Sequence, residues 1–166
     1  MGGRPNGWSM FLRYFVELAL PFETVDAELL GLPEEWIPGV ARDANDRGER
    51  LLAEVGFGPQ NRRVQKQVRI ELGEAVRLSS KTVLPMSWRA SGLQPLFPVL
   101  EADIEVAALG PNRTQLSINA RYEPPFRALG RAIDRALMHR VAEATVKDFL
   151  DRVAQGLQAR VSTRAE

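Results

Sequence analysis

The chain has 166 residues, of which 45% are hydrophobic and 26% charged, as expected for one soluble domain with a buried core. Its 22 Lys and Arg nearly balance its 21 Asp and Glu, so it lacks the strong positive field typical of nucleic-acid binding. The absence of cysteine excludes a disulfide, a thiolate nucleophile and a Cys-ligated metal. No apolar run is long enough to cross a bilayer or has the form of a signal peptide, so we expect a cytoplasmic protein.

The N-terminal part predicts a tail, a strand and a short helix. We interpret residues 1–8 as a flexible tail that precedes the domain. Residues 9–20 alternate apolar and polar side chains, which indicates a half-buried strand. Residues 23–31 then predict a short helix that ends at a glycine.

A loop and a charged helix are expected next. Two prolines in the segment 32–40 argue against a continuous helix, so we expect a loop with Trp36 and Ile37 exposed or half-docked at its apolar tip. Residues 41–55 predict a helix with a thin apolar stripe. Opposite charges spaced i,i+4, such as Asp43 and Arg47, support it. We expect a helix with so narrow an apolar stripe to cover an edge of the fold and not to fill its core.

Residues 64–123 predict short antiparallel strands with one dry face and one wet face. The polar face carries Glu101, Asp103 and Glu105, which we interpret as an exposed strand surface and not as a metal site. The dry face collects Val68, Ile70, Leu72, Leu84, Met86, Trp88, Ala102, Ile104, Val106, Ala108, Leu116, Ile118, Ala120 and Tyr122.

A long helix is predicted from about 126 to 158, followed by a tail over 159–166. Its apolar residues recur every four positions, so the apolar stripe drifts around the helix axis. A strongly twisted antiparallel sheet that holds the helix in its concave face suits such a stripe. We therefore expect a single domain over 9–158.

Few titratable groups are candidates for chemistry. His139, the single histidine, lies in a polar stripe about 120° from the apolar arc of the helix, and we interpret it as solvated and near Glu143. Arg140 falls inside the apolar arc, where it either snorkels, pairs with a carboxylate at the sheet edge, or meets a ligand carboxylate or enolate. Tyr122 is either a strand-end phenol that reaches water or a catalytic group. Asp134 is either an exposed helical carboxylate or a catalytic group.

This order of elements resembles the helix-grip or START-like (SRPBCC) superfamily, which includes polyketide cyclase/dehydrase and lipid-transport proteins. The stretches "ELALPFETVDAELL", "LPMSWRASG", "LFPVLEADIEVAALGPNRTQLSINARYEPP" and "LGRAIDRALMHRVAEATVKDFLDRVAQGL" carry the resemblance. It implies an α+β helix-grip fold, in which a curved antiparallel sheet wraps around a long C-terminal helix accompanied by two shorter helices. It also implies a pocket for a hydrophobic molecule between the sheet and the N-terminal half of the last helix.

The residues of the dry face agree with such a pocket. Small side chains at Ala102, Ala108 and Ala120 leave space, although the same face could instead close-pack as a solid core. Trp36 and Ile37 would lie at the mouth as a lid. The candidate ligand-binding residues are Trp36, Ile37, Leu84, Met86, Trp88, Phe97, Ile104, Ile118, Tyr122, Ile133, Leu137 and Arg140.

Three functions remain open. The leading hypothesis is binding or transport of a small hydrophobic molecule, such as a lipid or polyketide, without a cofactor or a metal. The second is a cyclase-like or dehydratase-like enzyme that uses the same pocket. The third is an interaction protein that docks through the Trp36 and Ile37 tip. A monomer and a homodimer are both compatible with the sequence.

Overall fold

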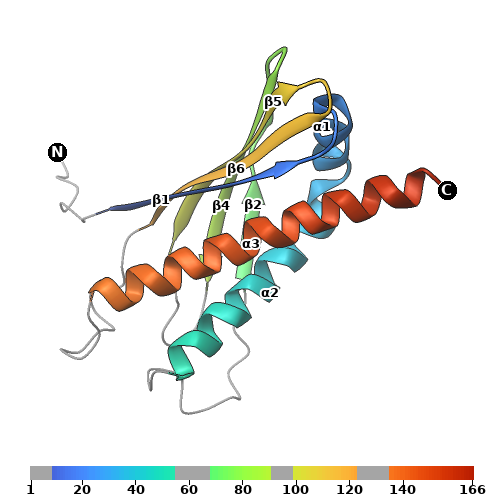
Figure 1. Cartoon of the computed structure of the whole chain (residues 1–166). Helices are drawn as coiled ribbons and strands as arrows, with labels where there is room; N and C mark the ends of the chain where they lie inside the picture. Colours follow the sequence, from blue (N-terminus) through green and yellow to red (C-terminus); the bar gives the residue numbers. More distant parts are fainter. Residues whose placement is uncertain (1–8, 55–67, 91–98, 123–134) are drawn as a thin grey trace.

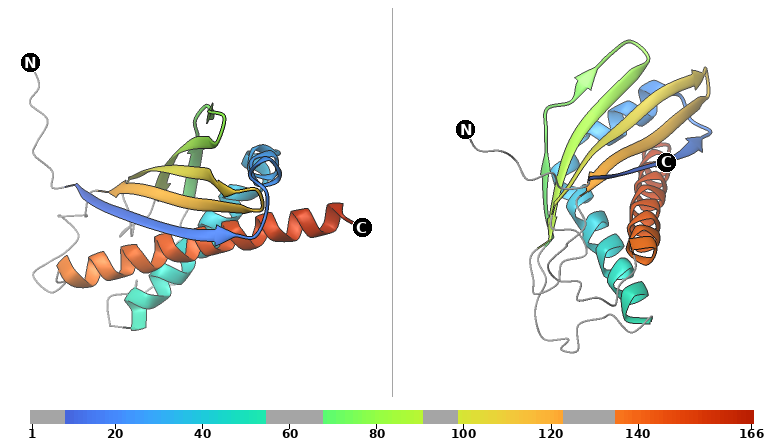
Figure 2. Two further views of the ribbon diagram at one scale, coloured as in Figure 1. Left: turned by 45° about the horizontal axis from the view of Figure 1, so that its top comes forward. Right: turned by 90° about the vertical axis from the view of Figure 1, so that its left-hand side faces the viewer.

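The computed structural model describes residues 9–54, 68–90, 99–122 and 135–166. The described segments form a sheet with helices packed against one of its faces (Figures 1 and 2). Residues 1–8, expected as a tail, lie outside the described part. The elements are β1 Met10–Leu18, α1 Phe22–Leu30, α2 Pro33–Glu54, β2 Val68–Leu72, β3 Val76–Arg77, β4 Lys81–Ala90, β5 Leu100–Gly110, β6 Arg113–Tyr122 and α3 Arg135–Arg164.

The sheet is antiparallel and has the strand order β1-β6-β5-β4-β2, with β3 also paired to β4. The first strand of the chain therefore pairs with the last one. Its register places Leu12 opposite Ala120, and the β5–β6 register places Ile104 opposite Ile118. These pairs bring apolar side chains together on one face, so the expected division into a dry and a wet face is confirmed. Ala108 is an exception, because it is exposed near the end of β5.

The helices divide the dry face of the sheet between them. The long helix α3 packs against β1 and β6, α1 against β5 and β6, and α2 against β2. Helix α2 also packs along α3 (Figure 2). The chain thus has the α+β helix-grip fold, with a curved antiparallel sheet, a long C-terminal helix and two shorter helices.

The apolar stripe of α3 is confirmed over its described length. Every fourth residue is buried, at Val141, Thr145, Phe149, Val153 and Leu157. Thr145 satisfies its hydroxyl by donating to the Val141 carbonyl at 2.8 Å. The helix continues to Arg164, well into the segment 159–166 that was expected as a tail.

The expected loop over 32–40 is wrong, because α2 begins at Pro33 and runs through Pro38 to Glu54. Pro33 fits because the first residue of a helix needs no hydrogen-bonded N–H. Pro38 removes one backbone hydrogen bond from the helix interior, which typically costs about 3 kcal/mol. Burial of Ile37 and Ala41, both 0% exposed on the same helix, offsets this cost.

The apolar tip expected at Trp36 and Ile37 is therefore also wrong. Ile37 is part of the hydrophobic core. Trp36 is half-buried, with its ring against Gly156 of α3 and the Arg160 guanidinium 5.3 Å from the ring centre. Trp36 thus packs α2 against α3, and because Ile37 is buried the two residues do not form an exposed lid.

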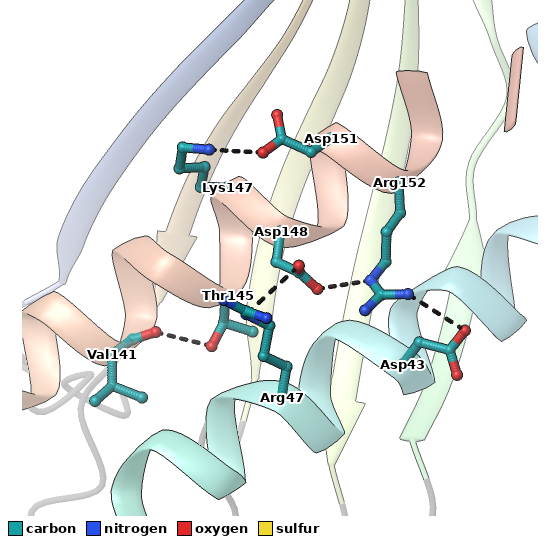
Figure 3. A network of polar contacts seen from close by, with 8 residues as sticks. All are labelled: Asp43, Arg47, Val141, Thr145, Lys147, Asp148, Asp151 and Arg152. Carbon is teal, nitrogen blue, oxygen red and sulfur yellow. Dashed lines mark hydrogen bonds and ion pairs between the residues drawn. The ribbon is translucent and has the colours of Figure 1, made fainter. Parts of the chain in front are cut away.

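Ion pairs also connect α2 to α3 (Figure 3). Asp148 lies between two arginines, 3.6 Å from Arg47 of α2 and 2.7 Å from Arg152 of its own helix. Arg152 in turn lies 3.9 Å from Asp43 of α2. Asp43 and Arg47, expected to pair with each other, thus each have a partner on α3. Because Asp43 and Arg47 are exposed to water and their partners on α3 are only partly buried, each pair contributes less than about 1 kcal/mol and mainly sets the alignment of the helices.

The C-terminal end of α3 is held by a buried carboxylate. The side chain of Glu28 on α1 is 4% exposed, and its oxygens lie 2.6 Å from the Arg164 Nη1 and 3.5 Å from the Arg160 Nε. Arg160 also donates to the Gly31 carbonyl at 3.3 Å. The carboxylate thus joins the last two turns of α3 to the end of α1.

Replacing Glu28 with Gln should lower the free energy of unfolding by about 1–3 kcal/mol, because a buried, charge-assisted contact is lost. Urea denaturation measures this change. Glu23→Gln is the matched control, since Glu23 lies on the same helix but is exposed, and its effect should stay within about 0.5 kcal/mol. Equal effects of the two substitutions would contradict a structural role for the Glu28 clamp.

Candidate functional site

The dry face of the sheet is the floor of the candidate site. Its central residues on β4, β5 and β6 are each at most 7% exposed: Leu84, Met86, Trp88, Ala102, Ile104, Ile118 and Ala120. Seven of the strand positions expected to face inward thus share one buried surface. We refer to these seven residues as the inner floor.

The sheet and α3 touch directly over part of this floor. The Trp88 ring meets the Phe149 ring edge to face, with centroids 5.7 Å apart. Both side chains are almost fully buried. At this point the space between the sheet and the helix is close-packed, so any ligand has to lie elsewhere along α3.

A polar contact occurs toward the N-terminal end of the described part of α3. Tyr122, the last residue of β6, is 1% exposed and lies opposite Met10 of β1 and Leu100 of β5. Its hydroxyl lies 3.3 Å from the Met10 sulfur and 3.4 Å from Nδ1 of His139 on α3. Three elements, β1, β6 and α3, thus meet at one phenol. We refer to Tyr122, His139 and Met10 as the Tyr122 cluster.

The interpretation of His139 as a solvated residue pointing away from the core is wrong. Its side chain is half-buried and lies within reach of the Tyr122 hydroxyl. A helical wheel gives angles between side chains of one helix, but it does not show where a neighbouring strand ends. Depending on the tautomer, Nδ1 either accepts a hydrogen bond from the phenol or donates one to its oxygen.

The surroundings of Tyr122 keep it neutral. Burial raises the pKa of the phenol from 10.0 to about 12, and the nearby Glu143 carboxylate acts in the same direction. At physiological pH the hydroxyl therefore keeps its proton and can donate a hydrogen bond. The expectation of a phenol that reaches water is wrong, because the side chain is buried.

The remaining candidates are distributed differently from the expectation. Arg140 is exposed, which agrees with the snorkelling alternative and does not support a contact with a ligand. Leu137 is half-buried and packs against the core. Phe97, Ile133 and Asp134 lie outside the described residues.

The acidic residues of β5 face away from the helices. Glu105 accepts a hydrogen bond from Asn119 at 2.8 Å and pairs with Lys81 at 2.6 Å. Within the described segments, no group of three His, Asp or Glu side chains is arranged to hold a metal ion. Glu105 therefore contributes to the polar surface of the sheet through these contacts.

A hollow of about 1040 Å³ lies on that polar surface. Its lining comes from the strands and Gly73, and it includes the outward side chains of Arg13, Glu71, Asp103 and Arg121. Among the described residues, none of those that line it comes from a helix. The hollow is thus distinct from the site expected between the sheet and α3.

No helix in the described part of the chain combines the length and the apolar character that a bilayer crossing requires.

Comparison with known proteins adds information about the fold. No protein-family model matches the sequence, and no curated protein matches it. Among solved structures, Ara h 8.0201 shares 9% identity, with 92% of this chain and 99% of that chain covered at a TM-score of 0.49. The Zhui aromatase/cyclase from Streptomyces sp. R1128 shares 14% identity, with 93% and 96% covered at a TM-score of 0.45.

A START superfamily protein from Mycobacterium smegmatis shares 15% identity, with 87% of this chain and 97% of that chain covered at a TM-score of 0.35. Sequence identities of 9%, 14% and 15% to these structures do not indicate a shared activity. The fold assignment itself follows from the order and pairing of the chain's own elements, which are those that the START-like resemblance implied.

The sequence did not reveal Met10 and His139 as members of the cluster. The signal that was missing is the pairing of β1 with β6, which places Met10 opposite Tyr122. Alternating apolar residues predict that a strand exists, but they do not say which strand lies beside it. His139 could have been found by asking which helix position meets the end of the last strand.

Ionisation of Tyr122 should destabilise the fold at high pH. The unfolded phenol ionises near pH 10.0, whereas the folded one keeps its proton until about pH 12. The stabilisation is therefore complete below pH 10.0, and up to about 2.7 kcal/mol is lost as the pH rises through 12.

Urea denaturation as a function of pH measures this loss. Tyr122→Phe should lose less stability than the wild type over this interval. Tyr14→Phe, which alters the other tyrosine, should follow the wild type. Parallel pH curves for wild type and Tyr122→Phe would contradict the assignment of the raised pKa to Tyr122.

Proposed function

We propose that the protein binds a small hydrophobic molecule that carries a hydrogen-bond acceptor, between the inner floor and the N-terminal part of α3. The observation that carries this proposal is the Tyr122 cluster. A buried, neutral phenol meets a histidine from the facing helix at the end of an otherwise apolar surface. Ligand sites for small molecules typically combine apolar walls with a few convergent polar groups.

The two parts of the site have different roles in binding. Apolar walls supply affinity, since burying about 200 Å² of ligand surface contributes about 5 kcal/mol before entropic costs. The Tyr122 hydroxyl and the His139 ring supply orientation, because an acceptor on the ligand can take a hydrogen bond from a donor that is already held in position. A lipid or polyketide carbonyl has the required chemistry.

The proposed lining keeps the inner floor residues, with the Trp88–Phe149 contact as its boundary, together with Leu137, and it extends to Phe97 and Ile133. Trp36, Ile37 and Arg140 are not part of it. Trp36 packs against α3, Ile37 is part of the hydrophobic core, and Arg140 is exposed. Without an apolar tip at Trp36 and Ile37, the expected docking role of that tip is also left without a structural basis.

A second candidate function is cyclase-like or dehydratase-like catalysis at the same place. The contact between Tyr122 and His139 favours it, since a phenol donor beside an imidazole can move a proton to and from a carbonyl compound held nearby. His139→Asn distinguishes the two functions. A carrier should keep its ligand affinity within a few fold, whereas an enzyme should lose conversion of an added poly-β-ketone while still binding it.

The protein should prefer a ligand that carries a hydrogen-bond acceptor, and removal of the Tyr122 hydroxyl should abolish this preference. The wild type should bind acetylnaphthalene about 2- to 10-fold more tightly than ethylnaphthalene, because the ketone accepts a hydrogen bond worth about 0.5–1.5 kcal/mol. Tyr122→Phe should bind both probes with equal affinity. Titration calorimetry measures the dissociation constants, and mass spectrometry of an organic extract identifies any co-purified molecule.

Tyr14→Phe is the matched control for this experiment. It removes a hydroxyl from the same chain, but that hydroxyl donates to Asp151 at 3.2 Å beside the middle of α3. The control should keep the preference for the ketone. No binding of either probe by the wild type, or an unchanged preference in Tyr122→Phe, would refute the proposal.

A further inference from the structure

Strand β1 lies at one edge of the sheet. Within the described residues it pairs with a single strand, β6, along its full length from Met10 to Leu18. Its other edge faces away from the sheet (Figure 2). A free strand edge presents unpaired N–H and C=O groups that can pair with another chain.

The outward side chains of β1 do not resemble those of a protected edge. Phe11 is 72% exposed and Phe15 is 55% exposed, two of the largest apolar groups open to water in the described part of the chain. Arg13 lies between them, and Glu17 follows. Natural edge strands usually carry lysine, proline or a bulge that discourages pairing, whereas two exposed phenylalanines favour burial.

The charges of β1 are self-complementary. If a second copy pairs antiparallel with β1 about a two-fold axis through Phe15, each Arg13 lies opposite Glu17 of the other copy. The same register places Leu12 opposite Leu18 and Tyr14 opposite Val16, so apolar residues meet on the dry side. Among the described residues Arg13 has no ion-pair partner within its own chain, and it is therefore available for this contact.

We propose that two copies of the chain associate through antiparallel pairing of their β1 strands, centred on Phe15. This joins the two sheets into one continuous sheet over residues 12–18 and brings the two Phe15 side chains together at the axis, with one Phe11 at each end of the paired stretch. Glu17 already pairs with Arg113 of its own chain. A carboxylate has two oxygens and can accept from both arginines, so this pair does not exclude the second one.

The chain contains no cysteine, which permits a test of the register by single cysteines. At the two-fold axis the two Cα atoms of residue 15 would lie about 4.5–5.5 Å apart, within the range of a disulfide. Phe15→Cys should therefore form a disulfide-linked dimer under mild oxidation. Phe11→Cys should not, because the two copies of residue 11 would lie about 27 Å apart.

A mixed experiment checks the charge pair. Arg13→Cys and Glu17→Cys should each remain unlinked alone, yet an equimolar mixture of the two should yield the linked dimer. Linkage of Phe11→Cys in preference to Phe15→Cys, or no linkage in the mixture, would overturn the proposed register. Circular dichroism confirms that each variant is folded.

The wild type tests the association itself. Light scattering should give a mass that rises with concentration from 18.5 kDa toward twice that value. Phe15→Lys should stay at 18.5 kDa, because it places two positive charges at the axis. Leu78→Lys is the matched control, since Leu78 is 60% exposed but lies outside β1, and it should associate like the wild type. A constant monomer mass for the wild type, or a dimer that Phe15→Lys leaves intact, would refute the proposal.

Discussion

The need to cover one dry face of a wide sheet shapes the whole molecule. Strands lie about 4.8 Å apart and a helix with its side chains is about 10–12 Å wide, so one helix covers about two strands. Helix α3 packs mainly on β1 and β6 and reaches β4 through the contact of Phe149 with Trp88, which leaves much of the inner surface of β5 and β2 to other elements. Helices α1 and α2 supply that cover, and α2 must be long to reach β2 while it stays in contact with α3. This explains why a helix continues through Pro38: the apolar area it buries is worth more than the hydrogen bond it loses.

The same arrangement determines where the proposed ligand would lie. The C-terminal end of α3 is fixed by the buried Glu28 carboxylate and by Trp36, and its middle is packed by the contact of Phe149 with Trp88. The N-terminal end of the described helix meets the sheet at the Tyr122 cluster, where polar and sulfur atoms replace close-packed hydrocarbon. A rigid far end and a polar near end are a suitable frame for holding an oriented hydrophobic molecule, because the walls lose little entropy on binding.

Strand β1 links the two proposed sites. Its inward residues serve the interior, since Met10 contacts Tyr122 and Tyr14 donates to Asp151 of α3. Its outward residues Phe11 and Phe15 are exposed at the free edge of the sheet. Pairing of two copies along this edge would stiffen the strand that carries Met10. The proposed dimer would thus support the proposed ligand site without contributing a residue to it.

Local sequence patterns determined much of this protein. Alternating apolar residues identified the strands and their dry face, and a spacing of four identified the buried stripe of α3, because side-chain direction repeats with the backbone geometry of each element. Only the tertiary structure decided the remaining features, which are the pairing of β1 with β6, the continuation of α2 through Pro38, and the meeting of His139 with Tyr122. Each of these depends on free energy gained from residues distant in the chain. A local sequence pattern predicts the cost of a proline and the direction of a histidine on its helix. It does not predict which distant element packs against them.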